Sequence, residues 1–432
     1  MHWGRATREQ RGWYFYDFAN SAFASTVLTL FLGPYLTALA KAAAGPDGYV
    51  HPFGLAIEPR SVWSFCISLS VISQVLTLPL VGAIADHGRK KKELLALFAY
   101  LGAGATMAMY FLQGAQYLLG VFLFFVANLS FGCANVVYNA FLPEIATPQE
   151  RDEVSSTGWA LGYLGGGLLL ILNLALYTNA ARLGVAEGMA VRISLCSAGL
   201  WWAVFALIPL RALRNGGQAR AGVNVFQAGF GQLWHTVRQL PKYPETLKFL
   251  AAYLLYNDAI QAIIALSGQF GSDELGIPMG TLTLAILMVQ FVAAAGAAAF
   301  GFLAGKITAL RAVCLALVCW IGIVIYAYVA VRSTAEFFVM AALVGLIMGG
   351  SQALSRSLYS LMIPQGSEAE YYSLYEISDK GTSWMAPLIF GLALQMTKSY
   401  RVAILSLIVF FVLGLLLLVQ VDVRRAAREA AA

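Results

Sequence analysis

Long apolar runs alternate with short polar breaks along the whole chain. A helix needs about 20 mostly apolar residues to cross the ~30 Å hydrocarbon core of a bilayer. Twelve runs are long enough, at residues 13–40, 61–85, 93–112, 117–141, 154–178, 188–210, 244–270, 280–304, 308–331, 335–361, 372–397 and 400–421. The pattern therefore predicts an all-α membrane protein with twelve transmembrane helices.

The distribution of charge orients these helices. Apolar residues make up 59% of the 432 residues and charged residues 12%. Nineteen of the 28 Lys and Arg residues fall in the alternate breaks that include both chain ends, and seven fall in the other set. This asymmetry is the positive-inside signal, so we expect both termini in the cytoplasm and an integral protein of a bacterial inner membrane. The net charge of +6 follows from topology and gives no reason to expect nucleic-acid binding.

Several functional classes find no support in the sequence. The chain does not begin with an apolar core followed by a small-residue cleavage site, so the first helix is expected to remain as an anchor. The histidines and cysteines lack metal-binding spacings, and we find no catalytic triad or phosphate loop. We therefore expect no enzyme, no cofactor and no metal. The cysteines are interpreted as free core residues: Cys66, Cys133, Cys196, Cys314 and Cys319.

A polar segment at residues 211–243 separates the helices into two sets of six. The expected domains are an N-terminal half at 1–210, a cytoplasmic linker at 211–243 and a C-terminal half at 244–432. Apolar residues recur at helical spacing within the linker and indicate an amphipathic helix, which lies on the membrane surface or packs against the protein. These residues are Phe226, Phe230, Leu233, Trp234 and Val237.

The two halves carry an internal repeat. The segment that starts at Gly82 is echoed 219 residues later at Gly301, and Tyr138, five before a proline, is echoed 221 residues later by Tyr359. In the first and seventh helices the offset is 240, and the extra residues correspond to a polar segment near 41–60. Repeats of this kind are typical of secondary transporters, whose substrate site lies near the midplane between the halves.

The first helix contains a carboxylate and a carboxamide, Asp17 and Asn20. An acid near the centre of a membrane helix costs roughly 2.5–3.5 kcal/mol, so Asp17 should face a partner or a water-filled cavity. The alternative is that Asp17 stays solvated near the headgroups, since Arg11 is only six residues away. Thr7 and Gln10 form a candidate capping box that would start this helix.

The seventh helix places Asp258 at the membrane midplane. It is fourteen residues from both Pro244 and Ser272, about 21 Å along a helix. Asn257 and Gln261 are four apart and share a face. Asp258 is therefore a candidate proton or ammonium site, or else a carboxylate held structurally by a neighbouring helix.

Further polar candidates lie in other helices. Arg356 in the tenth helix should hold an anion or an acidic side chain, because its guanidinium stays charged. Glu376 and Lys380 in the eleventh helix are four apart, so they form either a site or a structural ion pair. The remaining candidates are Asn135, Tyr138 and Asn139 in the fourth helix and Gln352 in the tenth. The glycines at 158, 162 and 165–167 should permit close helix packing, and the charged run 150–153 is a solvated loop or a partner of the other half.

The loop after the second helix carries Gly82, Asp86, Arg89 and Lys90. It resembles the signature loop of the major facilitator superfamily, in which a small residue permits close helix approach and an Asp meets a helix N-terminus and an Arg. The resemblance implies that these four residues gate the cytoplasmic side. Only His87 separates Asp86 from the next glycine, whereas the family pattern has two residues there.

Three stretches inside predicted helices are similar to the vacuole effluxer family, a branch of that superfamily which includes vacuolar amino-acid exporters. They are Trp13-Tyr-Phe-Tyr-Asp17-Phe-Ala-Asn20-Ser-Ala-Phe23, Tyr253-Leu-Leu-Tyr256-Asn257-Asp258-Ala-Ile-Gln261, and Gly349-Gly-Ser-Gln352-Ala-Leu-Ser355-Arg356-Ser-Leu358. The resemblance implies the twelve-helix major facilitator fold, alternating access and an amino-acid substrate.

We therefore expect a monomeric secondary transporter, surrounded by membrane lipid, that moves a small polar solute by alternating access. Asp17 or Asp258 would take the ammonium of an amino acid, and Arg356 or Lys380 its carboxylate. Proton coupling is expected at Asp17, Asp258 or Glu376. The rivals are an exporter or flippase of lipid or another amphiphile, and a receptor or scaffold that transports nothing.

Overall fold

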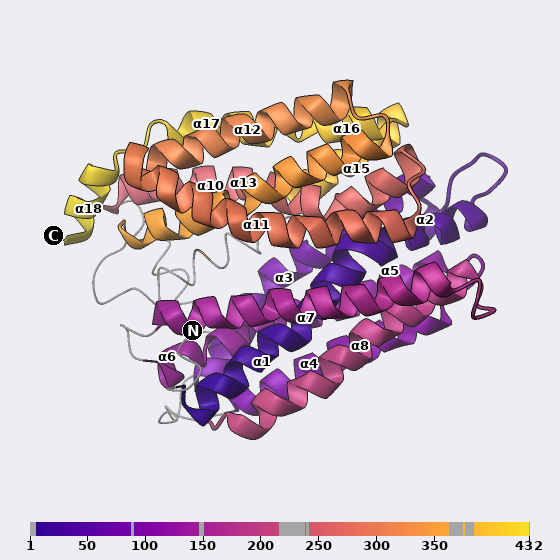
Figure 1. Cartoon of the computed structure of the whole chain (residues 1–432), viewed down its shortest axis with the longest axis horizontal. Helices are drawn as coiled ribbons and strands as arrows, with labels where there is room; N and C mark the ends of the chain where they lie inside the picture. Colours follow the sequence, from indigo (N-terminus) through magenta and orange to yellow (C-terminus); the bar gives the residue numbers. More distant parts are fainter. Residues whose placement is uncertain are drawn as a thin grey trace. The chain divides into compact units, whose positions relative to one another are not determined.

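The computed structural model describes residues 6–87, 90–146, 151–215, 242–362 and 384–431, together with Arg238 and Tyr375 (Figure 1). All long elements in these ranges are helical. The chain divides into two compact units, residues 1–231 and 232–432. The amphipathic helix expected at 226–237 lies outside the described residues.

The first unit begins with a helix in three parts: α1 (Arg8–Ala22), a π-helical segment η1 (Phe23–Phe31) and α2 (Leu32–Ala43). Two short 3₁₀ turns follow, η2 (Pro52–Gly54) and η3 (Pro59–Ser61). The remaining elements are α3 (Val62–His87), α4 (Lys91–Ala108) with η4 (Met109–Phe111), α5 (Tyr117–Asn139), α6 (Leu142–Ile145), α7 (Arg151–Asn179) and α8 (Glu187–Ala212).

The second unit begins with α10 (Pro244–Gln269), which continues into a second π-helical segment, η6 (Phe270–Glu274). The helices that follow are α11 (Met279–Ile307), α12 (Ala309–Val329), α13 (Thr334–Ser360), α15 (Met385–Thr397), α16 (Tyr400–Ser406), α17 (Ile408–Leu418) and α18 (Val423–Ala431).

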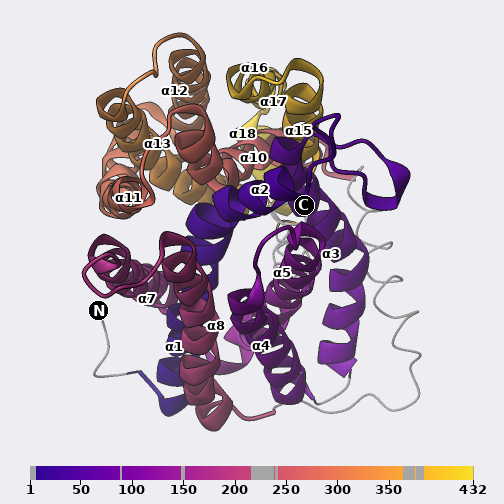
Figure 2. The same ribbon diagram turned by 90° about the vertical axis from the view of Figure 1, so that its right-hand side faces the viewer.

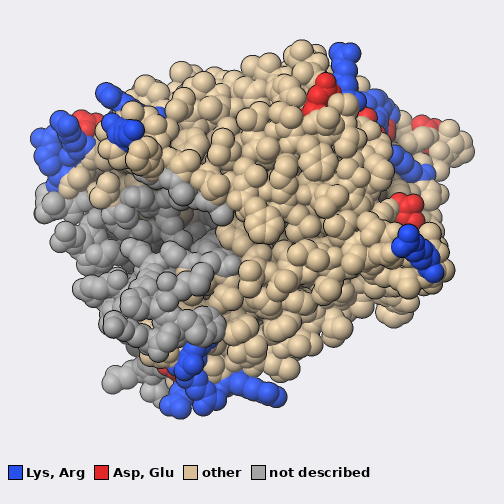
Figure 3. All heavy atoms as spheres, viewed as in Figure 1, with Lys and Arg blue, Asp and Glu red and all other residues tan. Residues whose placement is uncertain are grey.

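These helices match the apolar runs of the sequence. Within the described ranges, ten helices are long and apolar enough to cross a membrane, and two further apolar helices are shorter, Met279–Ala293 and Met385–Thr397. Large apolar side chains such as Phe122, Phe291 and Leu416 are exposed on helix surfaces. On the face drawn in Figure 3, charged residues gather near helix ends and leave the stretches between them uncharged. The fold class predicted from the sequence is confirmed.

Side chains at the start of the first helix of each unit bind backbone at the end of another helix. In the first unit, Thr7 and Gln10 form the predicted capping box, and Gln10 Nε2 also donates to the carbonyl of Ile145 in α6. In the second unit, Thr246 Oγ1 donates to the carbonyl of Met362 just after α13. In both units, a side chain near the start of the first helix thus donates a hydrogen bond to a carbonyl at the end of a later helix, as backbone groups in a membrane protein need internal partners.

Arginines satisfy carbonyls at the opposite ends of the helices. Arg192 on α8 donates to the carbonyl of Tyr110 in η4, and its guanidinium lies over the ring of the same tyrosine. Arg401 on α16 donates to the carbonyls of Tyr328 and Val331 at the end of α12. A positive charge is favourable at these C-terminal ends, where free carbonyls carry partial negative charge.

The last helix, α18, begins with a cap from Asp422. Its Oδ1 accepts from the backbone N–H groups of Arg424 and Arg425, at 2.9 and 3.1 Å. These donors, with that of Arg425 contributing most, hold the pKa of the exposed Asp422 carboxyl below its usual range. Glu245 at the start of α10 accepts from the N–H of Asp422. The end of the chain is therefore tied to the first helix of its own unit.

Glycines on α7 let this helix approach α1 as closely as predicted. A Cβ added at Gly162 would lie 2.8 Å from Ser21 Oγ, and one at Gly165 would lie 2.3 Å from the backbone oxygen of Phe18. Gly167, by contrast, faces open space. The prediction that the glycines at 158, 162, 165 and 166 serve packing is confirmed, while Gly167 faces away from that contact.

A matched pair of alanine substitutions tests this packing. Gly165→Ala should lower the free energy of unfolding by about 1–3 kcal/mol, because the added methyl meets backbone that cannot move aside. Gly167→Ala should be neutral or stabilise by up to ~1 kcal/mol, since alanine has the higher helix propensity. Unfolding in detergent micelles measures both. Equal stability of the two variants would mean that α7 and α1 do not pack as described.

Candidate functional site

A polar cluster in the first unit is built around Asp17 on α1. The hydroxyl of Tyr138, on α5, donates to Asp17 Oδ2 at 2.9 Å. The Tyr138 ring stacks on that of Trp13, with centroids 4.3 Å apart, and Trp13 Nε1 donates to the Tyr138 carbonyl at 3.0 Å. Asp17 itself is half-buried. The acid is therefore held in place by a phenol, and part of its surface stays exposed.

One turn along both helices, a second pair of predicted residues meets. Asn20 Nδ2 donates to Asn135 Oδ1 at 2.7 Å, and both side chains are buried. Asp17 and Asn20 are three apart on α1, as are Asn135 and Tyr138 on α5, so each pair lies on one helical face. The structure thus brings four of the predicted site residues together. Asn139, the last residue of α5, is half-buried.

The wall behind Asp17 is a glycine of α7. A Cβ at Gly158 would lie 2.8 Å from Asp17 Oδ2, 2.8 Å from the Trp13 ring and 3.3 Å from the Tyr138 hydroxyl. A side chain at this position would have to displace the carboxylate. Gly158 therefore shapes the site, a role that its glycine-rich surroundings in the sequence did not distinguish from packing.

The second unit holds Asp258 on α10 almost completely out of contact with solvent. The residue is 1% exposed, and its Oδ2 accepts from the backbone N–H of Ala386 at 2.9 Å. Ala386 is the second residue of α15, so the carboxylate lies at the N-terminal end of that helix, where the helix dipole favours negative charge. Within the part of the chain that the structure describes, Asp258 Oδ1 is buried without a hydrogen-bond partner.

The other predicted residues of this unit have varied positions. Asn257 is fully buried beside Asp258, while Gln261, one turn later, and Gln352 on α13 are half-buried. The backbone of Arg356 belongs to α13, but its side chain lies outside the described atoms, as do Glu376 and Lys380 entirely.

Two residues in this unit were not singled out as site candidates from the sequence. The Tyr256 and Ser355 hydroxyls are 2.6 Å apart and join α10 to α13, and Ser355 Oγ donates to the carbonyl of Ser351. Both lie next to predicted site residues in the sequence. Tyr256 also follows the repeat, since it stands where Tyr16 stands in the first unit.

The expected gating residues lie around the turn between α3 and α4. Gly82 and Asp86 belong to the helical backbone of α3, but the Asp86 side chain lies outside the described atoms. Arg89 lies outside the described residues. Lys90 is exposed at the N-terminal boundary of α4. One of the contacts that the structure describes here is an ion pair between Lys91 Nζ and Glu144 Oε1 at 2.9 Å.

This ion pair joins the start of α4 to α6, and Lys91 also donates to the carbonyl of Ala140. Sequence reasoning missed both members, although Glu144 follows Pro143 at the end of a predicted helix. Nearby, Arg151–Glu153 of the charged run form the first turn of α7, and Glu150 lies outside the described residues. The part of that run which the structure describes is therefore helix and not loop.

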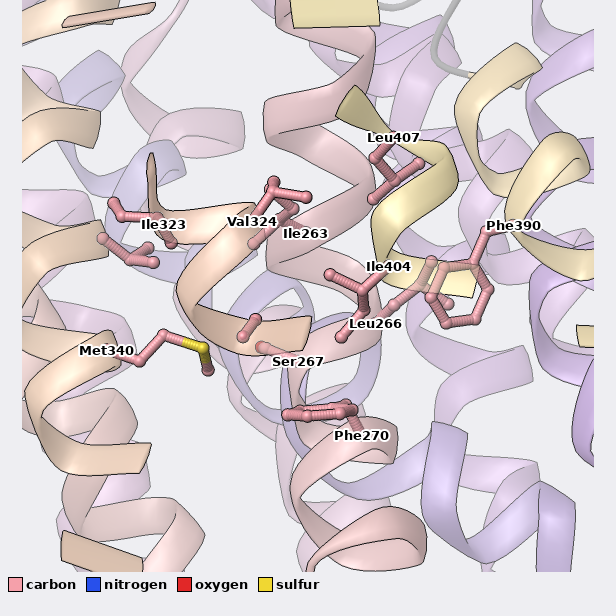
Figure 4. A pocket seen from close by; sticks show the side chains of 12 residues that line it. Ile263, Leu266, Ser267, Phe270, Ile323, Val324, Met340, Phe390, Ile404 and Leu407 are labelled. Atoms are coloured by element: carbon pink, nitrogen blue, oxygen red, sulfur yellow. The ribbon is translucent and has the colours of Figure 1, made fainter. Parts of the chain in front are cut away.

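An apolar cavity lies within the second unit (Figure 4). Its lining comes from α10, η6, α12, α13, α15 and α16 and includes Phe270, Met340 and Phe390. Among the described residues of its wall, the one polar side chain is Ser267, which donates its hydroxyl to the carbonyl of Ile264. This described lining offers no group that could bind the charged ends of a polar solute.

Comparison with known proteins identifies the family of this chain. Residues 5–431 match the family described as vacuole effluxer Atg22 like. The chain belongs to this family. It is 29% identical over 416 residues to an uncharacterised MFS-type transporter, YxiO, of Bacillus subtilis, covering 96% of this chain and 95% of the relative. It is 25% identical to Autophagy-related protein 22 of Kluyveromyces lactis, covering 99% and 96%. The resemblance seen in the sequence is confirmed.

Solved structures support the same fold. The nucleoside transporter NupG superposes with a TM-score of 0.67 at 13% identity, covering 98% of this chain and all of that one. A D-xylose-proton symporter gives a TM-score of 0.67 at 12% identity and covers 98% of both chains. At such identities the likeness concerns the fold. Together with its family, it makes this vacuole effluxer-like chain a multi-pass membrane transporter of the major facilitator type.

The contribution of the hydrogen bond between Tyr138 and Asp17 to stability can be measured. Tyr138→Phe keeps the stacked ring but removes the donor, and we expect a loss of about 1–2 kcal/mol in the free energy of unfolding. That is near the lower end for hydrogen bonds to charged groups, since Asp17 is half-buried. A double-mutant cycle with Asp17→Ala, which removes the acceptor, isolates the pair, and Tyr100→Phe, at an exposed position on α4, is the control. A coupling energy near zero would contradict the described bond.

Proposed function

We propose that this protein is a secondary transporter that exports amino acids by alternating access and is coupled to protons. The observation that carries the proposal is the environment of Asp258. Within the described residues, the Asp258 carboxylate accepts one backbone N–H and has a second oxygen without a partner, and removing a carboxylate from water costs several kcal/mol. Acids inside membrane segments commonly mark ion and proton pathways. A bound proton or cation removes that cost. Asp258 is thus suited to carry the coupling proton.

The two acids have different surroundings, which suggests a division of roles. Asp17 is half-buried and has Asn20, Asn135 and Tyr138 as polar neighbours, whereas Asp258 is fully buried. We assign the ammonium group of the substrate to Asp17 and the proton to Asp258. Arg356 or Lys380 would take the substrate carboxylate through charge-assisted hydrogen bonds. The direction of transport is inferred from the description of the family as effluxers.

The proposed location is a bacterial cytoplasmic membrane with both chain ends inside. This proposal rests on the excess of Lys and Arg in one set of connecting segments. Cysteine placed at Ala44 should react with an impermeant thiol reagent added outside sealed cells, and cysteine placed at Gly216 should react only after permeabilisation. The parent protein with its five cysteines provides the background. Labelling of Gly216→Cys from outside would overturn the orientation.

The coupling role of Asp258 is tested by removing its charge in proteoliposomes. Asp258→Asn should abolish accumulation of radiolabelled amino acids driven by a pH gradient, because an amide cannot release a proton. Counterflow exchange, which needs no net proton movement, should persist. Asp17→Asn is the matched comparison and should weaken both activities, since it removes the partner of the ammonium group.

Two outcomes would contradict this assignment. If Asp258→Asn still accumulates substrate against a gradient, Asp258 is structural and the proton must be carried at Asp17 or Glu376. If Asp258→Asn loses exchange and substrate binding together, Asp258 contacts the substrate directly. Failure of the unmodified protein to bind any amino acid would overturn the proposed substrate class itself.

A further inference from the structure

The loop between α2 and α3, residues 44–61, exposes apolar side chains at its tip. Phe53 is 99% exposed and Leu55 is 64% exposed. Both lie in or next to the turn η2, and His51 on the near side of that turn is also exposed. Unlike the exposed apolar residues on the helices, these two belong to a connecting segment, where water would ordinarily favour polar residues.

Phe53 has a backbone conformation that is unusual for phenylalanine. Phe53 has φ of 53° and ψ of 27°, in the left-handed region. Bulky residues rarely adopt this conformation, and turns that require it usually contain glycine or asparagine there. A residue that served only the turn would therefore be glycine, as at the neighbouring Gly54 with φ of 81°. The turn holds an aromatic ring at its outermost point.

Several contacts hold the loop in this shape. Val50 and Ile57 exchange both backbone hydrogen bonds, at 3.0 and 2.9 Å. Asp47 Oδ1 accepts from the N–H of Tyr49, and Asp47 Oδ2 lies 3.0 Å from His51 Nε2. These contacts fix the shape of the loop, and the residues between Val50 and Ile57 are apolar except for His51.

The second unit does without such a loop. There the corresponding helix ends with η6 at Glu274, and α11 begins at Met279. A four-residue connection is therefore sufficient to join the two helices in this architecture. Since the fold does not require the longer loop, residues 44–61 should serve another purpose.

We propose that the tip of the loop, Phe53 and Leu55, inserts into the interfacial layer of the surrounding bilayer. The loop joins two membrane-crossing helices, so its base lies at the level of the headgroups. Figure 2 shows it extending sideways past α3, away from the helices of its own unit. Aromatic and aliphatic side chains are favoured in that layer. Two side chains are too few for a stable protein interface, which buries roughly 1,200–2,000 Å².

A nitroxide at the tip tests the proposal in the full-length protein. The variant Leu55→Cys is spin-labelled and reconstituted in phosphatidylcholine vesicles, and relaxation by oxygen, which concentrates in the bilayer, is compared with relaxation by a water-soluble nickel chelate. Oxygen should be the stronger relaxant at position 55. A label at Ala115→Cys, in the exposed turn before α5, should respond more to nickel. The labelled parent protein gives the background from native cysteines.

The substitution Phe53→Gly separates insertion from folding. Glycine adopts the positive φ of this position without strain, so the variant should fold as well as the parent. In the combined variant, the label at position 55 should shift at least several-fold towards nickel. A tip label that responds to nickel as strongly as the Ala115 label would overturn the proposal. A label shielded from both relaxants would also overturn it, since it would indicate contact with protein.

Discussion

The exclusion of charge from the interior of a membrane governs the arrangement of this protein. Each half nevertheless keeps a carboxylate on its first helix, and the structure accommodates the two acids in different ways. Asp17 accepts a hydrogen bond from the Tyr138 hydroxyl and lies beside the hydrogen-bonded pair Asn20 and Asn135. Asp258 accepts a hydrogen bond from a backbone N–H at the start of α15, while its second oxygen is buried. Acids inside membrane segments are costly and commonly mark functional sites.

The same exclusion of water explains the hydrogen bonds at the helix ends. Carbonyls that would otherwise bind water accept hydrogen bonds from side chains of other helices in the same unit, namely those of Gln10, Thr246, Arg192 and Arg401. The two units do this in parallel ways, with Gln10 and Thr246 at one end of the helices and Arg192 and Arg401 at the other.

Close approach of helices is the second requirement for building a polar site here. Gly158 leaves room for the Asp17 carboxylate, and Gly162 and Gly165 bring α7 against the backbone of α1. Small residues take this role in membrane proteins because packing, and not the hydrophobic effect, drives helix association there. The cavity of the second unit differs from the cluster around Asp17, because its described lining is apolar apart from Ser267.

The sequence by itself determined the all-helical membrane fold and the family, and it predicted twelve spans in two halves. Those features depend on periodicity, length and local motifs, which any chain in a bilayer must obey. It also identified Asp17, Asn20, Asn135, Tyr138 and Asp258 as candidate polar residues inside membrane helices. Only the tertiary structure decided which partners they have. The pairing of Asp17 with Tyr138, of Asp258 with Ala386 and of Lys91 with Glu144 joins residues more than 50 positions apart. Such contacts depend on how the helices pack, and helix periodicity carries no information about them.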